Sequence, residues 1–147
     1  MKKFIIGIMV LMSISTSLAQ SNNGTDIQRE FMYFVYSDLD RMANKPSEKQ
    51  QSHIVKIGSY IDSLAKRGKL RNAQPFEMEG IRISGIKSDL KTSNFIVNKK
   101  VIAGYYHILA SDMAEAIEIA KADPRFEDEG WEIAIRPVKL IEGINNK

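Results

Sequence analysis

The sequence predicts an α+β fold of the ferredoxin-like βαββαβ type, in which an antiparallel sheet carries two helices on one face. Two observations predict it. Two segments have the apolar spacing of amphipathic helices, and each is preceded and followed by segments with strand patterns. The resulting order of strand, helix, two or three strands, helix and strand is that of a split β-α-β sandwich.

The first strand is expected at residues 31–36, which are aromatic and β-branched and are apolar at alternating positions on both faces. A polar connection over residues 37–45 follows. Pro46 suits the first turn of a helix, and Ser47 with Gln50 has the spacing of a capping box. The helix that follows has one apolar stripe and is expected to end at Gly68. The stripe consists of Ile54, Ile57, Ile61 and Leu64.

The middle of the chain is expected to supply the central strands. A second strand is expected at residues 81–86, in which Gly85 interrupts the alternation as a bulge would. A short third strand is expected at residues 95–97. Residues 98–100 then turn the chain into a longer fourth strand at residues 101–110.

A second helix is expected after Ser111 and Asp112, which are good N-caps, with Glu115 at the capping-box distance from Asp112. Its stripe consists of Met113, Ala116, Ile117 and Ala120. Asp123-Pro124 ends it. A last strand follows at residues 131–136, where apolar and polar positions alternate, and Pro137 stops it.

The first nineteen residues have the pattern of a secretory signal peptide. Lys2 and Lys3 precede an apolar run over residues 4–12, and Ser17-Leu18-Ala19 places small residues where a signal peptidase cleaves, after Ala19. The run is too short for a permanent membrane anchor. We therefore expect an exported protein, periplasmic or secreted, with a signal peptide at 1–19, a flexible tail at 20–29, a domain at 30–141 and a tail at 142–147.

Charge and composition exclude several classes of protein. The 147-residue chain has 21 Lys and Arg against 18 Asp and Glu, and loss of Lys2 and Lys3 reduces the excess of three to one. No basic stripe indicates a nucleic-acid partner, because the cations at residues 66–71 lie where a helix end favours positive charge. The chain has no cysteine, which excludes disulfides, a lipid anchor and a thiolate zinc site. We expect no metal and no cofactor.

Three motifs occur in the order and spacing of a known family. They are the Gly104-Tyr105-Tyr106 strand, the helix start with Asp112 and Glu115-Ala116, and the closing Arg136-Pro137-Val138. On these residues the chain resembles the YCII-related family, closest to the branch named for an Asp-Gly-Pro-Phe motif. The resemblance implies a ferredoxin-like fold that dimerises into an α/β barrel, with poorly defined activity. It therefore implies a homodimer.

The chain departs from the family's pattern at two functional positions. Counted back from Gly104, the naming motif falls on Thr92, Ser93, Asn94 and Phe95, so that only its Phe is retained. The family's first-helix His would fall on Ile57, and His53 lies one turn earlier. Both departures weigh against an enzyme.

The candidate site residues are two histidines and a set of aromatic and basic side chains. His107 is a weak candidate for a general base, on the strand face that also carries Tyr105, and His53 is a weaker one. For ligand binding we expect Tyr105 or Tyr106, which point to opposite faces, together with Trp131 and Arg136. The same residue types are enriched at dimer interfaces, so that both a cleft and an interface remain open.

Three hypotheses about function follow. The leading one is an exported domain of undefined activity that dimerises and encloses a small-molecule pocket. The second is an enzyme of the isomerase, lyase or hydrolase type that uses a His general base. The third is an interaction module for a partner in the cell envelope.

Overall fold

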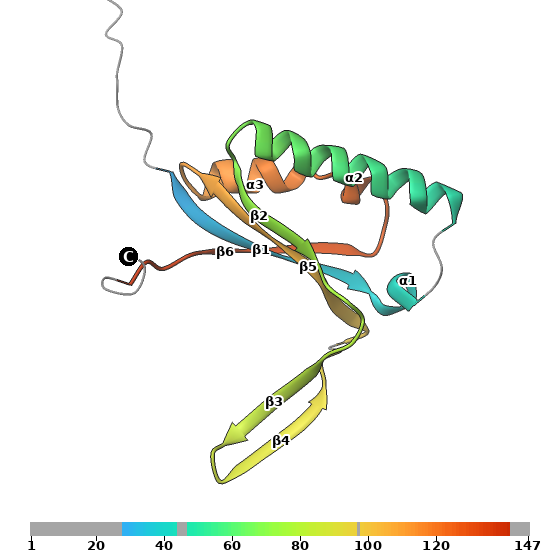
Figure 1. Cartoon of the computed structure of the whole chain (residues 1–147), viewed down its shortest axis with the longest axis vertical. Helices are drawn as coiled ribbons and strands as arrows, with labels where there is room; N and C mark the ends of the chain where they lie inside the picture. The colour runs from blue at the N-terminus through green and yellow to red at the C-terminus, as the bar shows by residue number, and fades with distance from the viewer. Residues whose placement is uncertain (1–27, 44–46, 97, 142–147) are drawn as a thin grey trace, which may run out of the picture.

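The computed structural model describes residues 28–43, 47–96 and 98–141 (Figure 1). The predicted signal peptide, most of the 20–29 tail, Pro46, Val97 and the 142–147 tail lie outside these residues. The elements in chain order are β1 (Arg29–Asp38), α1 (Leu39–Ala43), α2 (Glu48–Lys66), β2 (Leu70–Pro75), β3 (Ile81–Ile86), β4 (Asp89–Asn94), β5 (Lys100–Ala110), α3 (Met113–Lys121), the 3-10 helix η1 (Pro124–Glu127) and β6 (Trp131–Pro137).

The main sheet has four strands in the order β2-β5-β1-β6, and all of its neighbours are antiparallel. The units β1-α2-β2 and β5-α3-β6 interleave, so that each helix connects two strands separated by a third. Figure 1 shows α2 and α3 on the same side of this sheet. The predicted ferredoxin-like α+β fold with two helices on one face is therefore confirmed.

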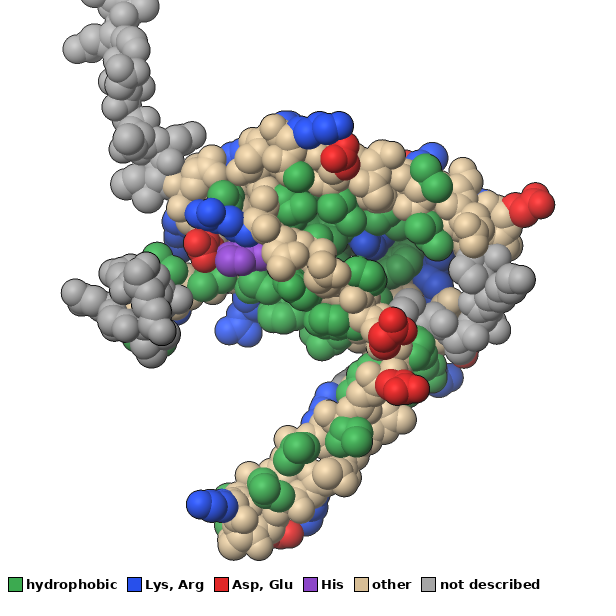
Figure 2. All heavy atoms as spheres, in the orientation of Figure 1, with side chains coloured by type: hydrophobic (Ala, Val, Ile, Leu, Met, Phe, Trp, Pro, Cys, Tyr) green, Lys and Arg blue, Asp and Glu red, His purple; other side chains and the backbone are tan. Residues whose placement is uncertain are grey.

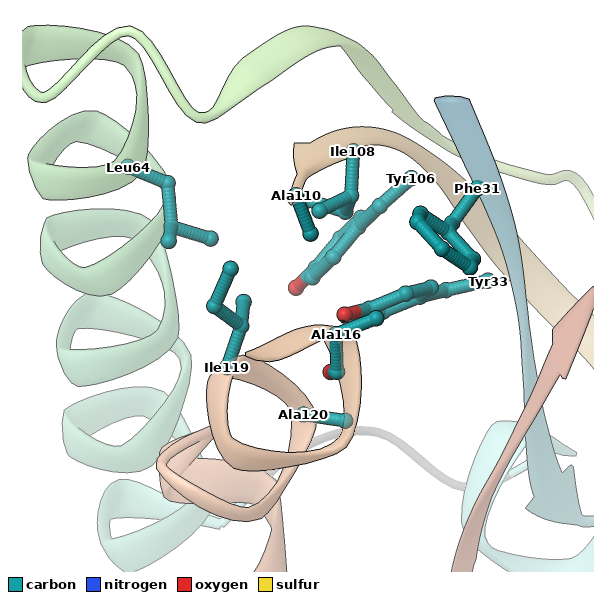
Figure 3. Close-up of a cluster of buried hydrophobic side chains, with 9 residues drawn as sticks. All are labelled: Phe31, Tyr33, Leu64, Tyr106, Ile108, Ala110, Ala116, Ile119 and Ala120. Atoms are coloured by element: carbon teal, nitrogen blue, oxygen red, sulfur yellow. Dashed lines mark hydrogen bonds between the residues drawn. The ribbon is translucent and has the colours of Figure 1, made fainter. Parts of the chain in front are cut away.

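The hydrophobic core lies between the sheet and the two helices (Figure 3). It consists of Phe31, Tyr33, Leu64, Tyr106, Ile108, Ala110, Ala116, Ile119 and Ala120. Two tyrosines reach the backbone of α3, since the Tyr33 hydroxyl donates to the Ala116 carbonyl and the Tyr60 hydroxyl donates to that of Ile119. A buried phenol needs such an acceptor, and these bonds fix the position of α3 over the sheet.

A bulge divides the pairing of β1 with β5. Val35 pairs with Gly104 and Tyr36 pairs with Ile102, which leaves Ala103 as the extra residue. Ala103 and Gly104 are consequently both buried, although they are adjacent on the strand. Beyond the bulge, Tyr106 pairs with Tyr33 and lies on the helix-covered face. Tyr105 pairs with Phe34, and both lie on the opposite face.

Local signals fix the ends of the helices much as predicted. The Ser47 side chain accepts from the Gln50 backbone, and the Gln50 side chain accepts in return from the Ser47 N–H, which confirms the capping box. Gly68 follows α2 with a φ of 67°, a conformation that glycine adopts without strain. Asp112 caps α3 by accepting from the Glu115 N–H.

The predicted stripe of α2 is only partly buried. Ile57 and Leu64 are buried and Ile61 packs against the core, but Ile54 is 53% exposed. The first half of α2 therefore stands over space that side chains of the sheet do not fill.

The central strands differ from the prediction. Residues 81–86 do form a strand, but its partner is β4, and this two-stranded hairpin projects away from the main sheet (Figures 1 and 2). Every residue of the hairpin is exposed, including Ile81, Ile83 and Ile86. The main sheet instead uses β2, which the sequence analysis missed because its Leu70–Pro75 segment contains two polar amides and a proline and has little apolar alternation.

Three smaller predictions were wrong. Phe95 and Ile96 are not in a strand, because the pairing of β4 with β3 ends at Asn94, and the Phe95 ring lies close to Gly80. Gly85 has a φ of 116°, but the β3–β4 register is continuous, so it marks no bulge. Part of the expected connection over residues 37–45 is regular structure, since β1 extends to Asp38 and α1 follows it.

Candidate ligand-binding cavity

A cavity of about 500 Å³ lies between the first half of α2 and the helix-covered face of the sheet. The helix contributes Gln50, His53, Ile54, Ile57, Gly58 and Ile61 to its wall. Figure 2 shows hydrophobic side chains along the hollow below α2, with basic side chains inside it. A hollow of this size, mostly apolar with a few polar groups, is typical of small-molecule sites.

One end of the cavity is apolar. Ala73 and Pro75 of β2 line it with Ile57 and Ile61 of α2. Tyr105 also borders it, although its side chain alternates to the opposite face of β5, where its ring lies 5.6 Å from that of Phe76. Gly104 and Gln74 also line this end. The two backbones approach so closely that a side chain at position 104 would collide with the Gln74 carbonyl oxygen. This end offers contact area rather than charge.

The other end gathers two arginines around the indole of Trp131. The guanidinium carbon of Arg41 lies 5.3 Å from the centre of the indole, and that of Arg125 lies 5.5 Å from it. Arg125 also lies 5.0 Å from the ring of Tyr106 and donates to its hydroxyl. Such cation–π contacts hold the guanidinium groups against the aromatic wall.

Each arginine is held by one carboxylate. Arg41 pairs with Asp128 at 2.9 Å, and Arg125 pairs at 2.7 Å with Asp123, whose side chain is 1% exposed. The hydrogen bond from Arg41 holds the pKa of Asp128 below its usual range. The second pair is almost entirely desolvated, so that breaking it would leave a buried charge.

Three buried nitrogen atoms of the wall have no hydrogen-bond partner among the described residues. They are His53 Nε2, Arg125 Nε and Trp131 Nε1. Buried polar atoms are nearly always paired, because an unpaired one costs about 1 to 3 kcal/mol. All three belong to residues that line the same cavity.

Tyr106 contributes a neutral phenol to this wall. Burial raises the pKa of the Tyr106 phenol well above its ordinary value, although the neighbouring Arg125 acts in the opposite direction. The hydroxyl therefore stays protonated at neutral pH and does not act as a base.

The structure brings three of the four predicted ligand-binding residues together. Tyr105, Tyr106 and Trp131 all line the cavity. Arg136 is exposed and pairs with Met32, on the face of the sheet that the helices do not cover. It therefore does not join the other three.

The two histidines lie in different places. His53 lines the cavity. His107 lies on the other face of the sheet, where its Nε2 is 3.0 Å from the Glu30 carboxylate, and both side chains are about one quarter exposed. A carboxylate in this position orients an imidazole. His107 thus has the partner that a general base would need.

Sequence reasoning missed both arginines of the cavity. Arg41 lies in α1, a helix that was not predicted, and Arg125 follows the Asp123-Pro124 pair that was expected only to end a helix. The one available signal was the local pattern at Asp123, which caps η1 by accepting from the Arg125 N–H.

Most of the chain matches one known protein family. The YCII-related domain matches residues 30–141. The chain belongs to the YCII-related domain family. A comparison with curated proteins found no match.

The family positions noted in the sequence can now be placed on this YCII-related domain. Ile57, where relatives can carry a His, lines the cavity, and His53 lines it one turn earlier. The position of the naming motif falls on the end of β4 and on Phe95, at the base of the hairpin and outside the cavity lining. The motif position and the cavity are thus separate in this YCII-related domain.

Two features are absent from the described residues. No helix among them is long and apolar enough to cross a membrane. No group of three or more His, Asp and Glu side chains in this part of the chain is arranged to hold a metal ion.

Proposed function

We propose that this YCII-related domain is exported and binds a small organic molecule in the cavity below α2. The observation that carries the proposal is the group of three unpartnered nitrogen atoms on His53, Arg125 and Trp131, three residues that all line one apolar cavity. A ligand that offers oxygen atoms to these nitrogens and apolar surface to the rest of the wall would satisfy both parts of the cavity.

The proposal includes a homodimer formed through the face of the sheet opposite the helices. Register places Met32, Phe34 and Tyr105 on that face, where each is half-buried in a single chain. The dimeric barrel implied by the family resemblance would cover this surface with a second copy of the same sheet. Burial of apolar side chains on both copies would supply the association energy.

The test is native mass spectrometry of residues 20–147 purified from the periplasm. We expect a dimer that carries additional small-molecule mass. Ile54→Trp should abolish that mass, because Ile54 lines the cavity but is 53% exposed, so added bulk enters the cavity without disturbing the core. Val55→Trp is the matched control, since Val55 is 67% exposed and lies outside the lining.

A dimer without additional small-molecule mass would contradict the ligand proposal. The same additional mass in Ile54→Trp and in Val55→Trp would also contradict it. A monomer would contradict the dimer. Export has a separate readout, because the periplasmic protein should have Gln20 as its first residue, and a chain that retains residues 1–19 in the cytoplasm would refute export.

A second candidate function is an enzyme in which His107 acts as a general base. The 3.0 Å contact of His107 with Glu30 favours it, because this contact supplies the acceptor that orients a catalytic imidazole. Any activity found should then be abolished by His107→Ala. An unchanged rate in the folded His107→Ala protein would exclude this role.

A further inference from the structure

We infer that the ligand of the cavity is an organic anion, with one carboxylate at the end formed by Trp131, Arg41 and Arg125 and an aromatic or aliphatic body at the end formed by Ile57, Ile61 and Pro75. This inference rests on the proposed function, because it names the chemical class of the molecule that occupies the same site.

The unpartnered atoms define what the ligand must present. Trp131 Nε1 and Arg125 Nε each carry a hydrogen and have no lone pair to accept with, so each requires an acceptor. His53 Nε2 donates or accepts according to its tautomer. A ligand placed here therefore presents oxygen lone pairs, and a ligand that only donates would leave both obligate donors unsatisfied.

Charge selects an anion over a neutral acceptor. Both guanidinium groups lie within 5.5 Å of the centre of the same indole. Asp128 and Asp123 hold the two guanidinium groups in place, and the lining of the cavity contains both arginines but no Asp or Glu that would repel an added carboxylate. Hydrogen bonds from such donors to an ionised oxygen are about twice as strong as those to a neutral one.

The remaining wall limits the rest of the molecule. Ile54, Ile57 and Ile61 of α2 line the apolar end together with Ala73 and Pro75 of β2, and none of these five side chains is charged. A second phosphate or carboxylate on the ligand would be desolvated there without a partner. A sugar would bury hydroxyl groups that this wall cannot satisfy. The walls therefore fit a monocarboxylate with a hydrophobic body.

The test compares acids with their amides, which have nearly the same shape and differ in charge. Calorimetry on the dimeric residue 20–147 protein, after removal of any bound molecule, would use three pairs: phenylacetate and phenylacetamide, indole-3-acetate and indole-3-acetamide, and octanoate and octanamide. We expect at least one acid to bind tenfold or more tightly than its amide.

Two variants assign the binding to the proposed donors. Trp131→Phe retains a ring but removes the Nε1 donor, and Arg125→Lys retains the charge beside Asp123 but removes the Nε donor. Each should weaken binding of the acid about tenfold, the usual effect of losing a hydrogen bond to a charged group. Tyr36→Phe is the matched control, since it removes a polar atom from an aromatic residue outside the cavity lining and should leave the affinity unchanged.

The outcomes separate this inference from the proposed function. Equal binding of acids and amides, or acid affinity unaffected in both folded variants, overturns the anion assignment and leaves a small-molecule cavity in place. Failure of every acid and every amide to bind overturns the anion assignment and the proposed cavity function together.

Discussion

The same substitution, glycine to alanine, should have opposite effects at two positions of the cavity wall. Gly58 lies in the middle of α2, and a methyl group added there meets no heavy atom within 4 Å. Alanine is favoured over glycine inside a helix by about 1 kcal/mol, mainly because glycine loses more backbone entropy on folding. We therefore expect Gly58→Ala to raise the free energy of unfolding by about 0.5 to 1 kcal/mol.

At Gly104 the geometry reverses the sign. A methyl group there would lie 2.6 Å from the Gln74 carbonyl oxygen and 3.1 Å from the Pro75 Cα. Both are backbone atoms of β2, so the strand itself must move away from β5. Overpacking of this kind costs about 1 to 3 kcal/mol. The two variants should thus differ in stability by about 1.5 to 4 kcal/mol.

Urea denaturation followed by circular dichroism and by the fluorescence of Trp131 measures both variants. Two-state unfolding requires that the two signals coincide, and an unchanged dependence on urea shows that only stability has changed. The reasoning is refuted if Gly104→Ala is as stable as the parent, because the close approach of β2 to β5 would then not exist.

Three further predictions concern the core, the helix cap and pH. Leu64→Ala should cost about 2 to 5 kcal/mol, because Leu64 is fully buried, whereas Ile54→Ala on the same helix should cost much less; equal losses in urea denaturation would contradict the packing described. Ser47→Ala should cost about 1 kcal/mol by removing the cap of α2, and Ser52→Ala, inside the same helix, should cost nothing measurable in the same assay. Hydrogen bonds from Lys69, and then from Ser111, lower the pKa of Glu115 from 4.5 to about 2. The stability from Glu115 is therefore fully present above pH 4.5 and is lost as the pH falls through 2, so most of the difference between the parent and Glu115→Gln should disappear between pH 5 and pH 2; a difference that is constant from pH 6 to pH 2 would refute the shift.

The helices and the long strands were predictable because their signals are local. Ser47 and Gln50 cap α2 through bonds within one turn, and the alternation of β6 repeats every second residue whatever it packs against. The partners of the strands were not predictable in this way. The isoleucines of β3 have a strong strand pattern, but only the tertiary structure determines that they pair with β4 and that the polar β2 takes the place beside β5.

The candidate site was predictable to the extent that strand alternation determines it. Tyr106 and Trp131 are aromatic residues on strands, and both line the cavity. Arg136 is five residues after Trp131, an odd separation that places it on the opposite face of β6. Arg41 and Arg125 reach the cavity from a one-turn helix and a 3-10 turn, where no periodicity in the sequence indicates a direction.

The partial burial of α2 has a consequence for local opening of the structure. Its second half is anchored by Leu64 and by the Tyr60 hydroxyl, whereas the described side chains before Ile57 include no buried one and stand over the cavity. The free energy of local unfolding should therefore rise along this single helix from its first turn to its last. Hydrogen exchange would show amides near residue 52 exchanging much faster than those near residue 62. The cavity can then exchange its contents by fraying of its own roof while the core behind Leu64 stays folded.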